Sequence, residues 1–205
     1  GEARGLEEAR GLDPSAFLPR AGGGLVPRDE EALLSALLAP SPLQVSCLSA
    51  RLTALRALGC YHAAGDFKAM LQHLARLGDA SVTVDVLRTG TLRRVPLDLE
   101  GALLLLPTLT QLLASSHEEH AEASLDALSL VLSSFGSVVA AARSAATGGV
   151  GVDLSGEARA RRCHECYDHF DAIRPRLREL AAGDGATQRR AVDLLQGIGL
   201  VMGMA

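Results

Sequence analysis

Three short motifs in this sequence combine residue types that could bind a metal ion or a phosphate group. Cys163, Cys166 and His169 follow one another at three-residue steps, a spacing that resembles that of zinc ligands. A zinc site needs a fourth ligand and usually a loop on which two thiolates converge. Both cysteines fall instead on the apolar stripe of a predicted helix, and free cysteine is among the most buried residue types. We therefore interpret the pair as core packing, with metal binding or redox chemistry as the alternative.

The other two motifs depart from the patterns that they resemble. His117-Glu-Glu-His120 has its histidines three positions apart, whereas the zinc-protease helix needs four. Residues 148–153 read Gly-Gly-Val-Gly-Val-Asp, but neither the Lys-Ser/Thr of a Walker motif nor a preceding strand accompanies them. No serine stands in a Gly-x-Ser-x-Gly elbow. The sequence therefore predicts no catalytic site, no metal and no cofactor, and a protein that is not an enzyme.

Basic side chains are the remaining polar chemistry, and they gather in two stretches. Residues 41–94 carry seven basic and three acidic side chains, and residues 158–205 carry eight and six. Such bands favour docking to an acidic polymer or an acidic partner, and ordinary solvated helix faces are the alternative. The overall charge of −4 argues against a general nucleic-acid binder. The predicted basic patch comprises Arg159, Arg161, Arg162, Arg174, Arg51, Arg56 and Lys68.

The elements that must position these residues are helices. The chain is rich in leucine and alanine, contains 3% aromatic residues and has no tryptophan. Apolar residues recur at three- and four-residue steps from Asp29 almost to the end, which predicts amphipathic helices. Predicted helices begin near Asp29, Pro42, Asp66, Asp79, Asp98, Ser116 and Ser155, and a last one carries Val192, Leu195 and Ile198.

Two of these helices matter most for the fold and for binding. The helix capped by Asp98 is apolar almost all round, so we expect it to be the buried centre. The helix that opens at Pro42 carries a stripe of Leu48, Leu52, Leu55 and Leu58. A stripe with this spacing either docks a partner helix or packs into the core of its own domain. Both interpretations remain open at this point.

About eight helices joined by short loops predict an all-α fold, either an antiparallel bundle or a short HEAT-like α-solenoid. Residues 1–26 are interpreted as a flexible linker in which Phe17 and Leu18 form a short anchor, and residues 27–205 as the helical domain. Four scattered cysteines make no disulfide framework, which indicates a reducing compartment. No run approaches the 18–20 apolar residues of a membrane span, so we expect no membrane association.

Nine stretches between residues 13 and 198 form a pattern that is found in one protein family. They are Asp13–Pro19, Gly65–Lys68, Leu77–Asp79, Val84–Leu87, Pro96–Leu99, Leu106–Pro107, Leu112–Ser115, Val150–Ser155 and Cys163–Tyr167. In this order they resemble the C-terminal domain of the katanin regulatory subunit, which normally joins an N-terminal WD-repeat propeller to this helical domain. Val95-Pro96 stands where the family usually has a tryptophan, and Ser116-His117 where it has Lys-Tyr.

The resemblance implies a non-catalytic regulatory and targeting domain of a microtubule-severing complex. Implied partners are the N-terminal helical domain of the katanin catalytic ATPase, microtubules, and adaptor proteins at spindle poles or minus ends. The implied location is the cytoplasm and the microtubule cytoskeleton, including spindle pole, centrosome or basal body. The rival hypothesis is a HEAT-like adaptor that binds disordered peptides without touching microtubules.

Overall fold

The computed structural model describes residues 34–35, 39, 41–144 and 154–203. Within these ranges there is no strand, which confirms the predicted all-α fold of about eight helices. The predicted linker 1–26, most of the predicted helix from Asp29 to Pro40 and the loop 147–153 lie outside the described residues. The helices are α2 (Pro42–Ala63), α3 (Phe67–Leu77), α4 (Ala80–Arg88), α5 (Thr91–Arg94), α6 (Leu99–Leu113), α7 (Glu118–Ser144), α8 (Leu154–Ala182) and α9 (Ala186–Met202).

Aspartate side chains fix the starts of three helices where the sequence predicts them. The Asp66 and Asp98 carboxylates accept hydrogen bonds from the backbone N–H groups of Ala69 and Gly101, at 3.0 and 2.7 Å. The Asp79 carboxylate accepts two, from the first turn of α4. Each bond satisfies an N–H group that the helix itself leaves without a partner. Two starts differ. Helix α7 begins at Glu118, two residues after the predicted cap Ser116, and the Ser115 hydroxyl accepts from the N–H of His117. Helix α8 begins at Leu154, so the predicted cap Ser155 lies inside it.

Helix α6 is the centre of the core, as its all-round apolar sequence predicts. It contacts α3, α7 and α8, and Leu106, Leu109 and Leu113 have no exposed surface. Pro107 lies within the helix. The buried hydroxyl of Ser124 on α7 donates to the Leu109 carbonyl at 2.8 Å, which joins the two helices by a satisfied polar contact.

The apolar stripe of α8 that carries both cysteines forms a seam, which is buried from Cys163 to Leu177, while Leu180 at its end is half-buried. Cys163, Cys166, Phe170, Ile173 and Leu177 are at most 1% exposed, and α8 contacts α6, α7 and α9. The seam therefore faces three helices at once, which explains why it is continuous.

The predicted last helix is present as α9, and the three residues that indicated it differ in burial. Val192 is 36% exposed, Leu195 is half-buried against the core and Ile198 is buried. Helix α9 packs against both α7 and α8, so its buried face is centred between them and includes small residues that an apolar stripe does not reveal. The buried residues are Thr187, Ala191, Leu194, Ile198 and Met202.

By length and composition, helix α7 is long and apolar enough to cross a membrane. The expectation from the sequence considered only unbroken apolar runs and did not include this helix. Within Glu118–Ala142, an 18-residue window reaches a mean hydropathy of 1.7. Leu125, Leu128, Val131 and Val139 on this helix are buried against its neighbours. We interpret α7 as a core helix of the bundle, because such helices satisfy the same criteria.

Candidate partner-binding surfaces

The leucine stripe of α2 is split between the core and the solvent. Leu58 is 3% exposed and belongs to the core, and Leu55 is half-buried against it. Leu48 is 57% exposed and Leu52 is 47% exposed. Val45, one turn before Leu48, is 49% exposed. The first half of α2 therefore presents an apolar ridge that no described residue covers, which is uncommon for three large side chains on one helix face.

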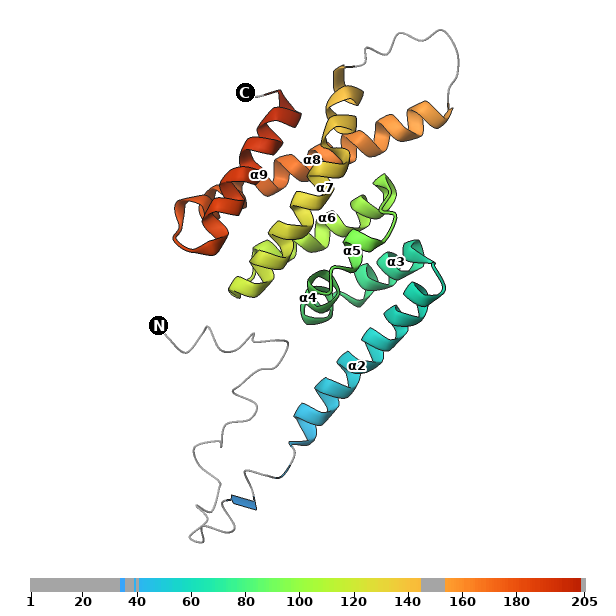
Figure 1. Cartoon of the computed structure of the whole chain (residues 1–205), viewed down its shortest axis with the longest axis vertical. Helices are drawn as coiled ribbons and strands as arrows, with labels where there is room; N and C mark the ends of the chain where they lie inside the picture. Colours follow the sequence, from blue (N-terminus) through green and yellow to red (C-terminus); the bar gives the residue numbers. More distant parts are fainter. Residues whose placement is uncertain (1–33, 36–38, 40, 145–153, 204–205) are drawn as a thin grey trace.

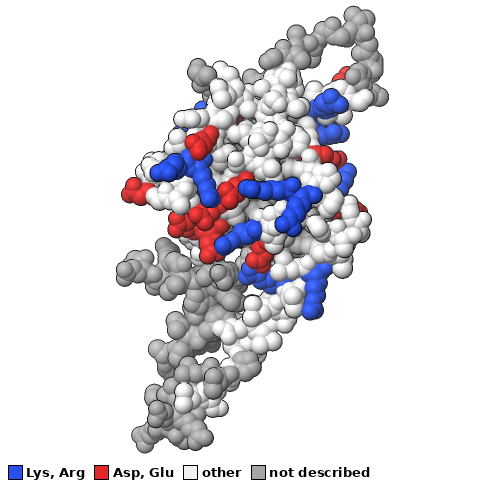
Figure 2. Space-filling model, in the orientation of Figure 1, with Lys and Arg blue, Asp and Glu red and all other residues white. Residues whose placement is uncertain are grey.

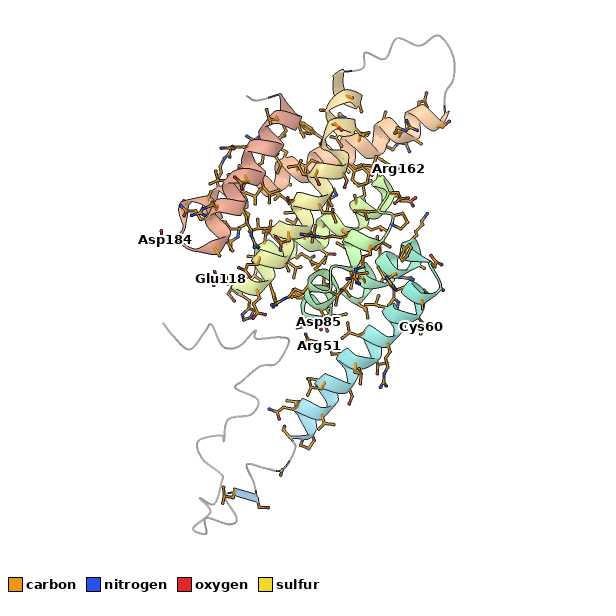
Figure 3. The ribbon with its side chains drawn as sticks, in the orientation of Figure 1. Arg51, Cys60, Asp85, Glu118, Arg162 and Asp184 are labelled. Atoms are coloured by element: carbon orange, nitrogen blue, oxygen red, sulfur yellow. The ribbon has the colours of Figure 1, made fainter. Side chains whose placement is uncertain are left out.

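The second half of α2 fixes the direction of this ridge. Figure 1 shows α2 leaving the other helices at its N-terminal end, while its C-terminal half lies beside α3 and α4. The guanidinium of Arg51 forms two hydrogen bonds to the Asp85 carboxylate on α4, at 2.6 and 2.5 Å. Figure 3 shows these two side chains facing each other between the helices. Near the end of α2, the rings of Tyr61 and His73 lie 5.6 Å apart.

The predicted basic patch is only partly assembled. Arg159 and Arg161 are exposed at the start of α8, and Arg162 is half-buried beside them. Lys68 on α3 forms an ion pair with Glu100 at 2.8 Å, and this hydrogen bond raises the pKa of Lys68, whereas nearby Arg162 lowers it. Arg162 on α8 is therefore close enough to Lys68 on α3 to act on its charge.

Other members of the predicted patch are held in internal pairs. Arg51 pairs with Asp85 as described above, and Arg174 pairs with Asp171 at 3.0 Å. The Arg174 side chain is only 17% exposed, so the expectation that it faces solvent is wrong. Arg56, in contrast, is exposed on α2. Figure 2 shows basic and acidic side chains alternating over the viewed face, without one continuous patch.

The cysteine pair lies in the core and carries protonated thiols. Burial raises the pKa of Cys163, and burial, together with Cys163 and Glu165, raises the pKa of Cys166 to about 12. Metal ions bind the thiolate form, which these surroundings disfavour. Among the described residues, no group of three histidine, cysteine or acidic side chains is placed to hold a metal ion.

This burial predicts selective alkylation of the four cysteines. With iodoacetamide at pH 8, exposed Cys60 is expected to react first, while Cys163 and Cys166 stay unmodified until the protein is denatured. Peptide mass spectrometry of a time course measures each site. Modification of Cys163 or Cys166 as fast as that of Cys60 would show an accessible, reactive pair and contradict the packing interpretation.

The two histidines of the stretch that resembles a zinc-protease motif lie at the start of α7. The rings of His117 and His120 lie 5.0 Å apart in an edge-to-face arrangement, and His120 is buried. The glycine-rich stretch 148–153 lies outside the described residues.

A groove between α7 and α9 is a feature that the sequence analysis missed. It has a volume of about 500 Å³. The two helices pack closely at its floor, where Gly197 has no side chain. A Cβ atom at this position would lie only 2.7 Å from Cδ2 of Leu132. Leu200 on its rim is 69% exposed. The available signal was a row of small residues on α7 at regular steps, Ser129, Ser133, Ser137 and Ala140.

Comparison with known proteins gives the family. The model of the con80 domain of katanin matches residues 44–197, from the first turn of α2 into α9. The chain belongs to this family. The resemblance inferred from the sequence is thereby confirmed, and the con80 match includes the α2 ridge and the α8 seam.

Curated relatives of the con80 domain come from plants and vertebrates. The katanin p80 WD40 repeat-containing subunit B1 homolog KTN80.3 of Arabidopsis thaliana is 30% identical over 174 residues, which are 82% of this chain and 21% of the relative. The katanin p80 WD40 repeat-containing subunit B1 of Danio rerio is 30% identical over 162 residues, 78% of this chain and 23% of the relative. The chain thus spans about a quarter or less of the length of these two relatives.

Proposed function

We propose that this chain is a non-catalytic regulatory and targeting domain of the katanin microtubule-severing complex. In this role residues 27–205 bind the N-terminal helical domain of the catalytic ATPase, and they bring the complex to microtubules. The observation that carries the proposal is the apolar ridge of α2 in a chain that belongs to the con80 family. The corresponding location is the cytoplasmic microtubule cytoskeleton, including spindle poles and minus ends where adaptor proteins gather.

The docking step follows from the exposure of the ridge. Leu48 and Leu52 project from the half of α2 that leaves the bundle, so a partner can approach them without displacing other helices. Full burial of a leucine side chain contributes about 1.5–3 kcal/mol, and these two are about half buried already. Leu55 and Leu58 anchor the same helix to the core, so the ridge is held rigidly for binding.

Co-elution tests this docking directly. The chain and the purified N-terminal domain of the ATPase are expected to migrate as one complex in size-exclusion chromatography. Two separate peaks at concentrations well above the micromolar range would contradict the proposed partnership.

Microtubule contact is proposed for the basic cluster at the start of α8. Arg159 and Arg161 are exposed there, with Arg162 and Lys68 close by. The C-terminal tails of tubulin are acidic, so attraction is strongest at low salt and is screened at high salt.

Charge reversal tests this contact. The double change Arg159→Glu and Arg161→Glu is expected to weaken microtubule co-sedimentation about tenfold at low salt, since a surface charge contact contributes up to roughly 1 kcal/mol and reversal adds repulsion. The double change Arg178→Glu and Arg189→Glu, at exposed arginines elsewhere, is the control for net charge. Equal loss in both variants would show that total charge matters and that the cluster does not.

The α7–α9 groove favours the rival function of a peptide-binding adaptor. A groove of about 500 Å³ with an exposed Leu200 on its rim can accept a few apolar side chains of a peptide. In that case the chain would not sediment with microtubules at any salt concentration.

A further inference from the structure

We propose that the α2 ridge docks an amphipathic helix whose flanks carry acidic side chains. This inference deepens the proposed function and rests on it, because the same ridge is the proposed docking site. It adds the secondary structure and the charge of the segment that binds there.

The spacing of the ridge fits a helix. Val45, Leu48 and Leu52 lie at steps of three and four, so they form one face over eight residues. At 1.5 Å per residue this face is roughly 10 Å long, which is two helical turns. A helix laid along it needs apolar residues at the same steps, as helix-in-groove partners have.

Charge selects among such helices. None of the 22 residues of α2 is acidic. Of its two arginines, Arg51 is neutralised by Asp85, whereas Arg56 is exposed and forms no ion pair among the described residues. Arg56 follows Leu52 by four positions, so it lies one helical turn beyond the apolar face, on the same side of α2. A docked helix therefore meets an unbalanced positive charge at one end of the ridge.

This charge disfavours two other occupants. A second copy of α2 would bring another helix without acidic residues, so two unbalanced arginines would share one apolar interface. A basic amphipathic helix would face the same repulsion. An acidic helix gains attraction at Arg56 and buries the same apolar surface.

Two synthetic helical peptides that differ only in charge provide the test. Both carry leucines at i, i+3 and i+7, and the remaining positions are mostly glutamate in one peptide and mostly lysine in the other. The full chain is titrated against each fluorescein-labelled peptide, and anisotropy measures binding. The glutamate peptide is expected to bind at least about tenfold more tightly than the lysine peptide, with affinity that falls as salt is added.

Matched variants locate the binding. Leu48→Glu is expected to abolish binding of the glutamate peptide, and Arg56→Glu to weaken it about fivefold and to reduce its salt dependence. Leu200→Glu and Arg189→Glu change the same residue types at exposed positions of α9 and should leave binding unchanged.

Several results would overturn the inference. These are equal affinity for the two peptides, equal loss in the Leu48 and Leu200 variants, or binding of neither peptide. If the ridge accepts the glutamate peptide only after removal of residues 1–40, the chain's own N-terminal segment is the occupant and the inference also fails. A dimer that Leu48→Glu converts to a monomer would assign the ridge to a second copy.

The same experiment separates this inference from the proposed function. If the glutamate peptide binds the ridge but the ATPase domain does not bind the chain, the ligand class is correct and the proposed partner is wrong. If the ATPase domain binds with equal affinity to wild type and to the Leu48→Glu variant, while neither peptide binds, the partnership holds and the ridge assignment is wrong.

Discussion

Replacing both Leu48 and Leu52 with glutamate is expected to lower the affinity of this chain for the ATPase N-terminal domain by at least about 100-fold. The change removes two apolar contacts and places two carboxylates where the partner would bury them, which costs several kcal/mol. Both side chains are about half exposed in the free chain, so the substitutions should leave the fold intact. Isothermal titration calorimetry measures the affinity, and circular dichroism checks the helical content.

The control for this variant is Leu200→Glu, because Leu200 is the more exposed leucine and lies on α9. It introduces the same chemical change on another surface and should bind the ATPase domain like the wild type. A double variant that binds as tightly as Leu200→Glu would show that α2 is not the docking helix. Loss of helical signal in the double variant would show that the fold needs the ridge. This would contradict the expectation from its exposure that the substitutions leave the fold intact.

Truncation of Phe170 to alanine is expected to cause the largest loss of stability among simple core changes. Phe170 is the largest fully buried side chain in the part of the chain that the structure describes, at 1% exposure in the middle of the α8 seam. Such a truncation costs about 3–5 kcal/mol in lost burial and residual cavity. For a domain of this size, that corresponds to a fall in melting temperature of roughly 10 °C or more.

Thermal denaturation followed by circular dichroism checks this value. Glu165→Ala changes an exposed residue of the same helix and should shift the midpoint by little, since surface changes usually stay within about 0.5 kcal/mol. A Phe170→Ala midpoint close to that of Glu165→Ala would show that α8 is not packed through this seam.

Much of the fold followed from local chemistry in the sequence. Asp66, Asp79 and Asp98 cap helices because their short carboxylates reach unpaired N–H groups within three residues, and this geometry depends on nothing distant. The α8 seam was predictable because three neighbouring helices demand one unbroken apolar face. The all-round apolar α6 could only be stable at the centre.

Features that depend on which helices meet were not predictable. Periodicity shows that Leu48 and Leu58 share a helix face, but not that α3 and α4 cover only one end of it. The last helix was predicted, but its buried face was not, because small residues such as Ala191 and Thr187 face the core where helices approach closely. Arg51 was assigned to a surface patch because nothing local shows that Asp85, 34 positions away, binds it.

The central claim is that this con80 domain binds the ATPase through the exposed ridge of α2, and calorimetric titration of the ATPase N-terminal domain into the full chain tests it most directly. The account predicts saturable binding to wild type, at micromolar affinity or tighter, that weakens with salt and disappears in the Leu48→Glu, Leu52→Glu variant. Absence of heat and of any shift in hydrodynamic size with the wild-type chain would contradict it, as would unchanged affinity in the variant.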